Sequence, residues 1–458
     1  MMFSPHTMWQ QISQSLSHLP QAATASTWWI AYSGGVDSHV LLHALHALQA
    51  ELPDISLKAI HINHKLQPDA DDWAEHCKSV CAAYDIELVI EALTIQQSIG
   101  HSLEAAAREA RYGAIAKHMH DNDVLLTAHH LDDQTETILL QLLRGAGTRG
   151  LSGMTMLSRF QHGWLMRPLL QHSRAAILDY AYDCNLQWID DSSNLNVAFD
   201  RNYVRHNVIP HLRARWPATD QMFARAAANL ADATKCLNDL ADIDLAEVDA
   251  RQETFYGQQT FSISIEALDS FSDARKNNLV RHWLHAHGFE TPDQTHLRRI
   301  LREVVGARED AQPCVHWHNV EIRRFQGRLY VMSLLKPVSV EWLSWDILRQ
   351  PELSLNGGVL TCLPATQGGL DSEHLKESHV EIRFRQGGER AQPHGIHHTR
   401  QLKKLFQEAH IPTWIRDRIP LIYVDGKLAA VPGLWVFEPF ACAKPGTGVD
   451  LHWHAMSD

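Results

Sequence analysis

A short run of small and acidic residues, Ser33 to Ser38, follows an apolar stretch in the first part of the chain and reads Ser-Gly-Gly-Val-Asp-Ser. Glycines let the backbone approach an anion closely, and the free N–H groups at the start of a helix attract negative charge. The run lacks the Gly-Lys-Ser/Thr ending of a Walker loop. It therefore predicts a phosphate-binding loop, with a tight turn capped by Asp37 or Ser38 as the alternative. The expected phosphate-binding residues are Ser33, Gly34, Gly35, Val36, Asp37 and Ser38.

A second group of chemically active side chains, Asp132, Asp133 and Glu136, lies within the segment 127–137. Glu136 follows the two aspartates by four and three residues, so a helix would place the three carboxylates on one side. Such a group binds Mg²⁺ or a cationic amine. The alternative is that these residues only stabilise the beginning of a helix. The metal candidates are Asp132 and Asp133.

Several basic segments could contact phosphate groups. Residues 201–215 contain four arginines and no acid, and residues 383–404 contain six Lys or Arg against one acid. A solvent-exposed helix face is the alternative for residues 201–215, and an ion network within one helix is the alternative for Glu104, Arg108 and Arg111. Because the formal net charge is -12, a nucleic acid would have to bind local basic patches.

Alternating strand and helix patterns surround these groups. The pattern predicts strands over 28–32, 58–63, 87–93 and 123–128, with helices over 37–50, 69–84, 102–120 and 132–144. This order is typical of a parallel sheet covered by helices. Both the loop and the acidic group follow predicted strands, so we expect them at the carboxyl edge of one sheet, where open α/β folds bind ligands.

The rest of the chain divides into two further predicted domains. Helices are expected over 218–249, 274–287 and 294–305, followed by strands 320–325 and 328–333. Strand-like runs, paired glycines and prolines then surround one helix, 399–410. The predicted domains are an α/β domain over 1–216, a mostly helical domain over 217–340 and a small α+β domain over 341–458.

Composition excludes several classes of protein. Seven cysteines are scattered without a Cys-x-x-Cys pair, so neither a disulfide framework nor a zinc ribbon is indicated. The first 20 residues do not read as a secretion signal, and no stretch approaches the roughly 20 apolar residues of a membrane span. We expect a cytoplasmic protein with no membrane partner; whether it forms a homodimer stays open.

The combined motifs resemble one family of the PP-loop ATP pyrophosphatases, the tRNA(Ile)-lysidine synthases. Besides the loop and the acidic group, the resemblance depends on LEAAAREARY at 103–112, RPLL at 167–170, WIDDSSN at 188–194 and DRNYVR at 200–205. It covers the whole first domain and returns in the last. It implies an adenine nucleotide alpha hydrolase-like PP-loop domain that uses ATP and Mg²⁺.

The implied reaction is formation of a carbon–nitrogen bond. An AMP-forming ligase would adenylate C2 of cytidine 34 in the CAU anticodon of tRNA(Ile), and free L-lysine would then displace AMP. The modified tRNA would read AUA in place of AUG and carry isoleucine in place of methionine. The resemblance makes Asp37 and Asp133 catalytic, with lysine or Mg²⁺ on Asp132, Asp133 and Glu136. The implied tRNA contacts are Arg201, Arg205, Arg383, Arg390, Lys403 and Lys404.

One departure and two alternatives accompany this interpretation. The family often closes its second strand segment with a basic residue, where this chain has His64-Lys-Leu-Gln67, so any role of Lys65 there is in doubt. A PP-loop tRNA thiolation enzyme would use the same adenylation, although the absence of a Cys-x-x-Cys pair counts against it. A non-catalytic nucleotide-binding or RNA-binding protein would have no need of both motifs.

Overall fold

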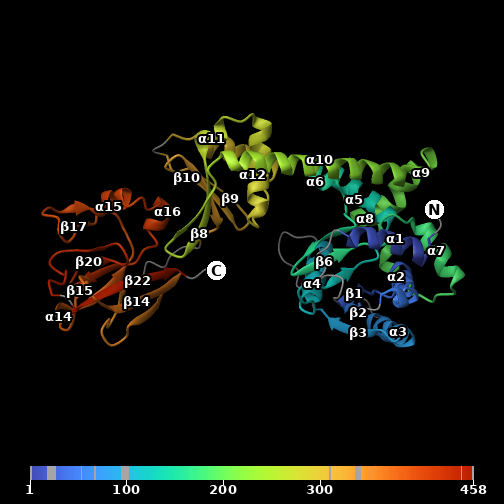
Figure 1. Ribbon diagram of the computed structural model, residues 1–458, viewed down its shortest axis with the longest axis horizontal. Helices are drawn as coiled ribbons and strands as arrows, with labels where there is room; N and C mark the ends of the chain where they lie inside the picture. The colour runs from blue at the N-terminus through green and yellow to red at the C-terminus, as the bar shows by residue number, and fades with distance from the viewer. Residues whose placement is uncertain are drawn as a thin grey trace. The chain divides into compact units, whose positions relative to one another are not determined.

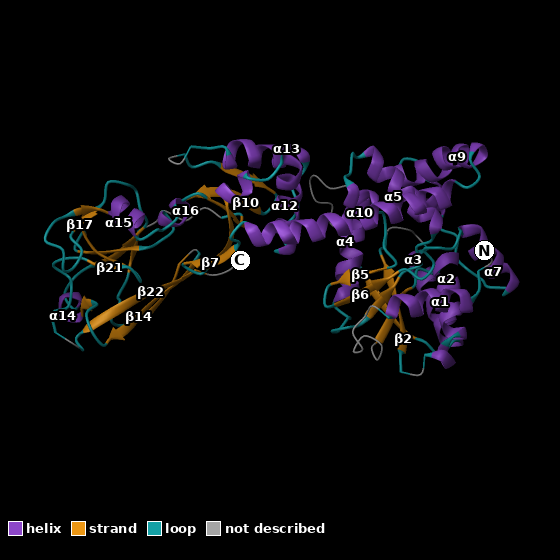
Figure 2. Ribbon diagram, turned by 45° about the horizontal axis from the view of Figure 1, so that its top comes forward, coloured by secondary structure: helices purple, strands orange, loops and turns teal. Residues whose placement is uncertain are grey.

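The computed structural model of the protein describes residues 3–17, 27–52, 54–65, 69–93, 103–308, 311–335, 342–355, 357–444 and 446–455. The chain forms two compact units, residues 1–236 and 237–458, which are shown in Figures 1 and 2. No helix in the described part combines the length and the apolar character that crossing a membrane would take.

A six-stranded sheet forms the centre of the first unit, with the strand order β3-β2-β1-β4-β6-β5. Pairing is parallel from β3 through β6, and β5 pairs antiparallel with β6 at one edge. The strands are β1 (Thr27–Ala31), β2 (Ser56–Asn63), β3 (Glu87–Ala92), β4 (Val124–Leu126), β5 (Leu157–Phe160) and β6 (Gly163–Met166).

Helices cover both faces of this sheet (Figure 1). On one face lie α1 (Pro5–Leu16), α2 (Val36–Ala47), α3 (Ala70–Ala83) and α7 (Arg174–Asp183), and on the other lies α4 (Leu103–Ala116). The unit also contains α5 (Leu131–Leu143), α6 (Thr148–Leu151), α8 (Asp200–Tyr203) and α9 (Ile209–Arg215). Three short turns of helix accompany them, namely η2 (Gln49–Glu51), η3 (Ser192–Leu195) and the π-helix η4 (Val204–Val208).

Alternation along β1 explains why helices lie on both faces. Trp28 and Ile30 point to one face and pack with residues of α1, α2, α3 and α7. Trp29 points to the other face and packs with Ile115 of α4. Both faces of a parallel strand are therefore buried, as expected for a sheet with helices on each side.

The second unit contains two sheet-rich parts. Helix α10 (Thr219–Glu247) begins in the first unit and ends in the second. The antiparallel sheet β7-β8-β11-β10-β9 is built from β7 (Arg251–Phe255), β8 (Gln258–Ser264), β9 (Cys314–Trp317), β10 (Val320–Phe325) and β11 (Arg328–Ser333). Its core also contains residues of α11 (Ile265–Asp269), α12 (Asp273–Ala286), α13 (Gln294–Arg299) and the π-helix η5 (Ile300–Val305).

The last part of the second unit is built from small sheets. Five strands form β12-β16-β19-β20-β21, four form β13-β14-β22-β15, and β17 pairs with β18. The bounds are β12 (Leu343–Ser344), β13 (Glu352–Leu355), β14 (Gly358–Ala365), β15 (Leu370–Asp371), β16 (Val380–Arg383), β17 (Arg390–Ala391), β18 (Arg400–Gln401), β19 (Leu421–Val424), β20 (Lys427–Val431), β21 (Trp435–Val436) and β22 (Gly448–Ala455). Helices α14 (Ser372–Leu375), α15 (Leu402–Glu408) and α16 (Thr413–Arg416) complete it.

The fold class predicted from the sequence is confirmed, with a parallel α/β domain first and a β-rich α+β part last. The four predicted strands of the first domain correspond to β1 to β4, and the hairpin strands 320–325 and 328–333 have the predicted bounds. Strands β5 to β9 and helix α1 were not predicted. The domain boundaries at 216 and 340 stay predictions.

Candidate functional site

The predicted phosphate loop joins β1 to α2. Ser38 Oγ accepts a hydrogen bond from the backbone N–H of Ser33 at 3.2 Å and donates to the carbonyl of Gly35 at 2.9 Å. Gly34 has a φ of +85°, and a Cβ there would lie 2.7 Å from Cδ1 of Ile189. The loop therefore requires glycine at this position both for its backbone angle and for the close approach of Ile189.

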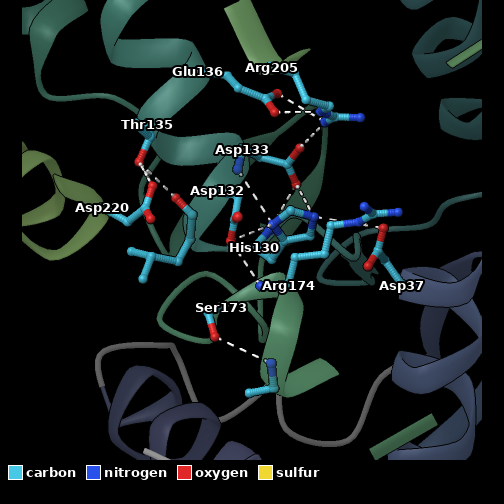
Figure 3. Close-up of polar contacts among 12 residues, drawn as sticks. Asp37, His130, Asp132, Asp133, Thr135, Glu136, Ser173, Arg174, Arg205 and Asp220 are labelled. Atoms are coloured by element: carbon cyan, nitrogen blue, oxygen red, sulfur yellow. Dashed lines mark hydrogen bonds and ion pairs between the residues drawn. The ribbon is translucent and has the colours of Figure 1, made fainter. Parts of the chain in front are cut away.

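Asp37 lies in the first turn of α2 and points toward the beginning of α5 (Figure 3). Its Oδ2 is 3.7 Å from Nε2 of His130. Its Oδ1 is buried and makes no hydrogen bond within the described chain. A buried carboxylate oxygen without a partner is costly, so this atom is available for a ligand.

His130 connects Asp37 to the acidic group. The ring is 2% exposed, and its Nε2 lies 3.4 Å from Oδ2 of Asp133. Burial alone would lower the pKa of His130, but the carboxylates of Asp133, Asp37 and Asp132 together raise it. His130 also caps α5, because its backbone N–H donates to Asp133 and its Nδ1 accepts from the backbone N–H of Asp133.

The Asp133 and Glu136 carboxylates are paired with two of the predicted tRNA-binding arginines. Arg201 contacts Glu136 at 2.7 Å and Asp133 at 2.9 Å, and Arg205 contacts them at 2.6 and 3.1 Å. The Glu136 side chain is 1% exposed. We call these four side chains, of which Figure 3 labels all but Arg201, the ion-pair cluster.

Electrostatics in the ion-pair cluster favour the charged forms of Asp133 and Arg205. Burial would raise the pKa of Asp133, but His130 and Arg201 lower it to about 2. The pKa of Arg205 is raised despite its burial, because Glu136 and Asp133 stabilise the charged guanidinium. Asp133 is thus suited to holding a cation and unsuited to accepting a proton near neutral pH.

Asp132 lies outside the ion-pair cluster. Its Oδ1 pairs with Arg213, and its Oδ2 accepts from the backbone N–H of Arg174 at 2.9 Å. Arg213 also pairs with Asp220 at 2.8 Å, and Asp220 accepts a hydrogen bond from Thr135. The structure therefore brings all the predicted carboxylates together, each already engaged by a cation or an N–H donor.

A cavity of about 990 Å³ lies beside the phosphate loop. Its lining includes Asp37 and residues of the loop, together with Arg111, His129, Arg174, Ile189 and Arg205. Lys65, the residue at the departure from the family pattern, also lines it. Burial lowers the pKa of His129 to about 3, so this ring is neutral. The cavity is large enough for a nucleotide and a small co-substrate.

The predicted contacts of the last domain differ in their availability. The Arg383 guanidinium lies over the rings of Trp342 and Tyr423, at 4.0 and 4.4 Å, and pairs with Glu381. Arg390 of β17 and the neighbouring Lys403 and Lys404 of α15 are exposed. For these last three, no ion pair is found in the described part of the chain.

Sequence reasoning missed several residues that shape the site. His130 was not selected, although its position before Asp132 and Asp133 was visible as a helix-capping place. Ile189 lies in the WIDDSSN motif at 188–194 but was given no role of its own, and Arg174 had no local signal, because tertiary structure brings it to the cavity. Glu104 lies outside the described side chains.

The predicted Mg²⁺ fits the site through one oxygen. Within the described residues no three His, Cys, Asp or Glu side chains are arranged to hold a metal. Mg²⁺ commonly binds one or two carboxylates and completes its shell with phosphate and water. The buried, unpartnered Oδ1 of Asp37 satisfies this requirement, whereas the oxygens of Asp132 and Asp133 are already engaged.

Family models match three parts of the chain. A PP-loop domain matches residues 8–212, a TilS substrate binding domain matches 263–330, and a TilS substrate C-terminal domain matches 380–453. The first match spans the phosphate loop and the ion-pair cluster, and the last spans the exposed basic residues of β17 and α15.

Curated relatives match nearly the whole chain. The tRNA(Ile)-lysidine synthase of Coxiella burnetii is 41% identical over 427 residues, covering 93% of this chain and 92% of that protein. The synthase of the same name from Methylococcus capsulatus is 36% identical over 429 residues, covering 93% and 96%.

Solved structures match smaller parts. A crystal structure of the TILS C-terminal domain is 25% identical, with a TM-score of 0.21, and covers 26% of this chain and 100% of that one. The U34-tRNA thiolase NcsA from Methanococcus maripaludis is 16% identical, with a TM-score of 0.40, and covers 49% and 79%.

Proposed function

The chain belongs to the tRNA(Ile)-lysidine synthase family, and from this premise we propose that it ligates free L-lysine to C2 of cytidine 34 in tRNA(Ile) with a CAU anticodon, in the cytoplasm. The family consists of ATP-dependent ligases, so the phosphate loop has a defined purpose. The observation that carries the assignment within the structure is that the phosphate loop, with the unpartnered Oδ1 of Asp37, lines a cavity of about 990 Å³.

The first step is adenylation of the tRNA. The C2 carbonyl oxygen of cytidine 34 attacks the α-phosphate of ATP, the bond to the β-phosphate breaks, and pyrophosphate leaves. Backbone N–H groups of residues 33–38 at the beginning of α2 stabilise the negative charge on the phosphates. Oδ1 of Asp37 would hold Mg²⁺, which would supply positive charge beside the phosphates.

In the second step the ε-amine of lysine, as the free base, attacks C2. The bond between C2 and the AMP oxygen breaks, AMP leaves with that oxygen, and the new C–N nitrogen releases a proton to solvent. The amine must be bound next to the adenylated base, and the Asp133 and Glu136 carboxylates are the acidic pair buried beside the cavity residue Arg205. We propose that this pair binds an ammonium group of lysine. The lowered pKa of Asp133 keeps this carboxylate charged, which suits recognition of a cation.

Arg201 and Arg205 must then move when lysine binds. In this structure they occupy the oxygens that lysine would use. Phosphate groups of an entering tRNA provide alternative partners for both guanidinium groups. The sequence predicted lysine or Mg²⁺ on the carboxylates and tRNA on Arg201 and Arg205. This exchange accommodates both, because the arginines can bind the carboxylates first and tRNA afterwards.

The last part of the second unit would bind tRNA away from the reacting base. Arg390, Lys403 and Lys404 are exposed and close in the fold, since β17 pairs with β18 and α15 follows β18 directly. Lysine and arginine without internal partners bind phosphates without reading sequence. Arg383 is less available, because Glu381 and two rings already hold its guanidinium.

One assay tests the proposed function and its competitors. The protein is incubated with Mg-ATP, labelled lysine and tRNA carrying a CAU anticodon, and both pyrophosphate and incorporated label are measured. We expect equal amounts of both products. Pyrophosphate without incorporated lysine would indicate thiolation or another acceptor, and neither product with any tRNA would rule out the ligase.

A further inference from the structure

An exposed apolar surface adjoins the mouth of the cavity. Leu195 is 72% exposed and also lines the cavity, so it lies at the rim. Phe199 and Tyr203 follow it along the chain and are 37% and 53% exposed. We call Leu195, Phe199 and Tyr203 the aromatic rim. Exposed aromatic rings beside a ligand cavity are unusual on a surface without a partner.

The aromatic rim and the arginines of the ion-pair cluster come from adjoining short elements of the chain. Leu195 ends η3, Phe199 is the extended residue before α8, and Tyr203 is the last residue of α8, directly before η4. Arg201 and Arg205 reach Asp133 and Glu136 of α5, with their side chains 25% and 26% exposed. Phe199 and Tyr203 are 37% and 53% exposed, so these rings face solvent while the arginines reach inward.

Hydrogen bonds hold the aromatic rim in place. His206 Nε2 lies 2.9 Å from the carbonyl oxygen of Asn194, and Asn202 donates to the carbonyl of Asn196 at 2.9 Å. The backbone N–H of Tyr203 donates to the carbonyl of Phe199 at 2.9 Å. The rings are therefore presented by an internally bonded segment, and their exposure follows from how the chain is folded.

We propose that the aromatic rim stacks the unpaired bases next to the nucleotide that enters the cavity. The inference rests on the proposed function, which requires one cytidine to leave its stack and reach the phosphate loop. Its neighbours must then cross the rim, where Leu195 continues the cavity wall. Residues 199–216 carry four arginines against one acid, and three of the four pair with carboxylates in this structure. The proposed exchange at the ion-pair cluster would turn Arg201 and Arg205 toward the phosphates of the same strand.

The partner is single-stranded nucleic acid by its chemistry. A base presents a flat π-face that stacks on Phe and Tyr whatever its sequence, and loops expose such faces where duplexes do not. The aromatic rim would hold the bases on both sides of the target in splayed positions, which would orient the target cytidine without recognising it.

The test compares two double variants that differ only in their rings. Phe199→Leu/Tyr203→Leu removes both rings and keeps apolar volume, whereas Phe199→Tyr/Tyr203→Phe keeps both rings. The probe is an RNA stem–loop with a CAU anticodon in which the anticodon adenine is replaced by fluorescent 2-aminopurine. We expect the leucine variant to bind this RNA about tenfold or more weakly and to lose the fluorescence change that stacking produces, with the ring-keeping variant like the wild type.

Controls separate this inference from folding and from the proposed function. ATP affinity and unfolding midpoint should be unchanged in both variants, because neither ring lines the cavity. Equal RNA affinity in both variants would overturn the inference, even if the wild type forms lysidine. A wild type that sediments as a dimer and a leucine variant that sediments as a monomer would also overturn it, since the rim would then be a subunit contact. Failure of the wild type to incorporate lysine would count against the function alone.

Discussion

At the scale of single residues, the site depends on three residues, each of which has a function that no neighbouring residue supplies. Asp37 offers one free oxygen, Gly34 provides the left-handed backbone, and His130 supports three carboxylates. Replacement of Asp37 or Gly34 should affect ATP binding and cleavage more than tRNA binding, because neither residue belongs to the basic segments.

Asp37→Asn should reduce pyrophosphate release by about 100-fold or more while tRNA affinity changes little. The amide cannot supply the anionic oxygen that metal and phosphate require, and loss of a preorganised charge commonly costs this much. Pyrophosphate release and tRNA filter binding measure the two effects. An equal loss of tRNA affinity would contradict the role assigned to Asp37.

Gly34→Ala should raise the KM for ATP at least about tenfold, because the new methyl group would lie 2.7 Å from Ile189 and displace the loop. Gly288→Ala is the matched control. Its φ is +77° and nothing lies within 4 Å, so it carries the backbone cost of about 1 kcal/mol without the clash. Steady-state kinetics of both variants, together with their unfolding midpoints, decide whether the clash matters.

His39 should make the first unit sensitive to acid. Its ring is 3% exposed, and burial lowers its pKa to about 4. The unfolded chain, with a pKa near 6.5, binds the proton first, so the stability contributed by neutral His39 is lost as the pH falls from about 6.5 toward 4. The loss should reach about 2 kcal/mol at pH 5.

Urea unfolding at pH 7.5 and at pH 5 measures this loss. His39→Leu removes the titrating group, so its free energy of unfolding should fall less between the two pH values than that of the wild type. The same decrease in both proteins would assign the acid sensitivity to other groups, such as His129, whose pKa is also lowered.

At the scale of elements, regular patterns were predictable and long-range pairings were not. The apolar runs of β1 to β4 and the 3.6-residue spacing of α2 to α5 are local signals, so the sequence located these elements and the loop between β1 and α2. The strands β5 and β6 have only four residues each. They join the sheet because β6 pairs with β4 and β5 pairs with β6 at the edge, and no local pattern indicates this pairing.

The candidate site likewise has a part that local spacing indicated and a part that depends on long-range pairing. The spacing of Asp132, Asp133 and Glu136 indicated one helix face; on α5, Asp133 and Glu136 share the two arginines, whereas Asp132 pairs with Arg213. The pairing of Asp133 and Glu136 with Arg201 and Arg205 joins positions 65 to 72 residues apart. Such pairing depends on tertiary packing, so composition alone suggested only a basic surface. The assigned roles of these residues stay predictions.

Asp123→Ala should destabilise the first unit by about 3 kcal/mol or more. This carboxylate is 4% exposed and accepts from Thr27 N, Trp29 Nε1 and His120 N at 3.1, 3.1 and 2.9 Å. Its loss leaves three donors without a partner between β1 and β4, each costing about 1–3 kcal/mol where it is buried.

Asp121→Ala is the control for Asp123, since Asp121 lies two residues away with its side chain 86% exposed. Its effect on the free energy of unfolding should stay within about 0.5 kcal/mol. Similar values for both variants in urea unfolding would show that the three hydrogen bonds contribute little.

At the scale of the whole molecule, a chain with a net charge of -12 must bind a polyanion through local basic surfaces. The triple variant Arg390→Gln/Lys403→Gln/Lys404→Gln should weaken binding of full-length tRNA. It should also reduce the dependence of log affinity on log salt by about 0.9 for each phosphate that the variant no longer neutralises. Binding of the isolated anticodon stem–loop should be unaffected.

Lys235→Gln provides the comparison, because Lys235 is 75% exposed and already paired with Asp232. Titrations at several salt concentrations should give it the slope of the wild type. A triple variant that kept the wild-type slope would mean that these three side chains do not bind phosphate.

The pairing of Arg201 and Arg205 with Asp133 and Glu136 has a practical consequence for inhibitor discovery. With its own cations in place, the acidic pair is already neutralised and has little affinity to offer a free amine. Amino-acid analogues screened against the isolated enzyme would therefore score as inactive whatever their fit. Compounds meant to compete with lysine should be screened in the presence of tRNA, where the guanidinium groups have phosphates to bind.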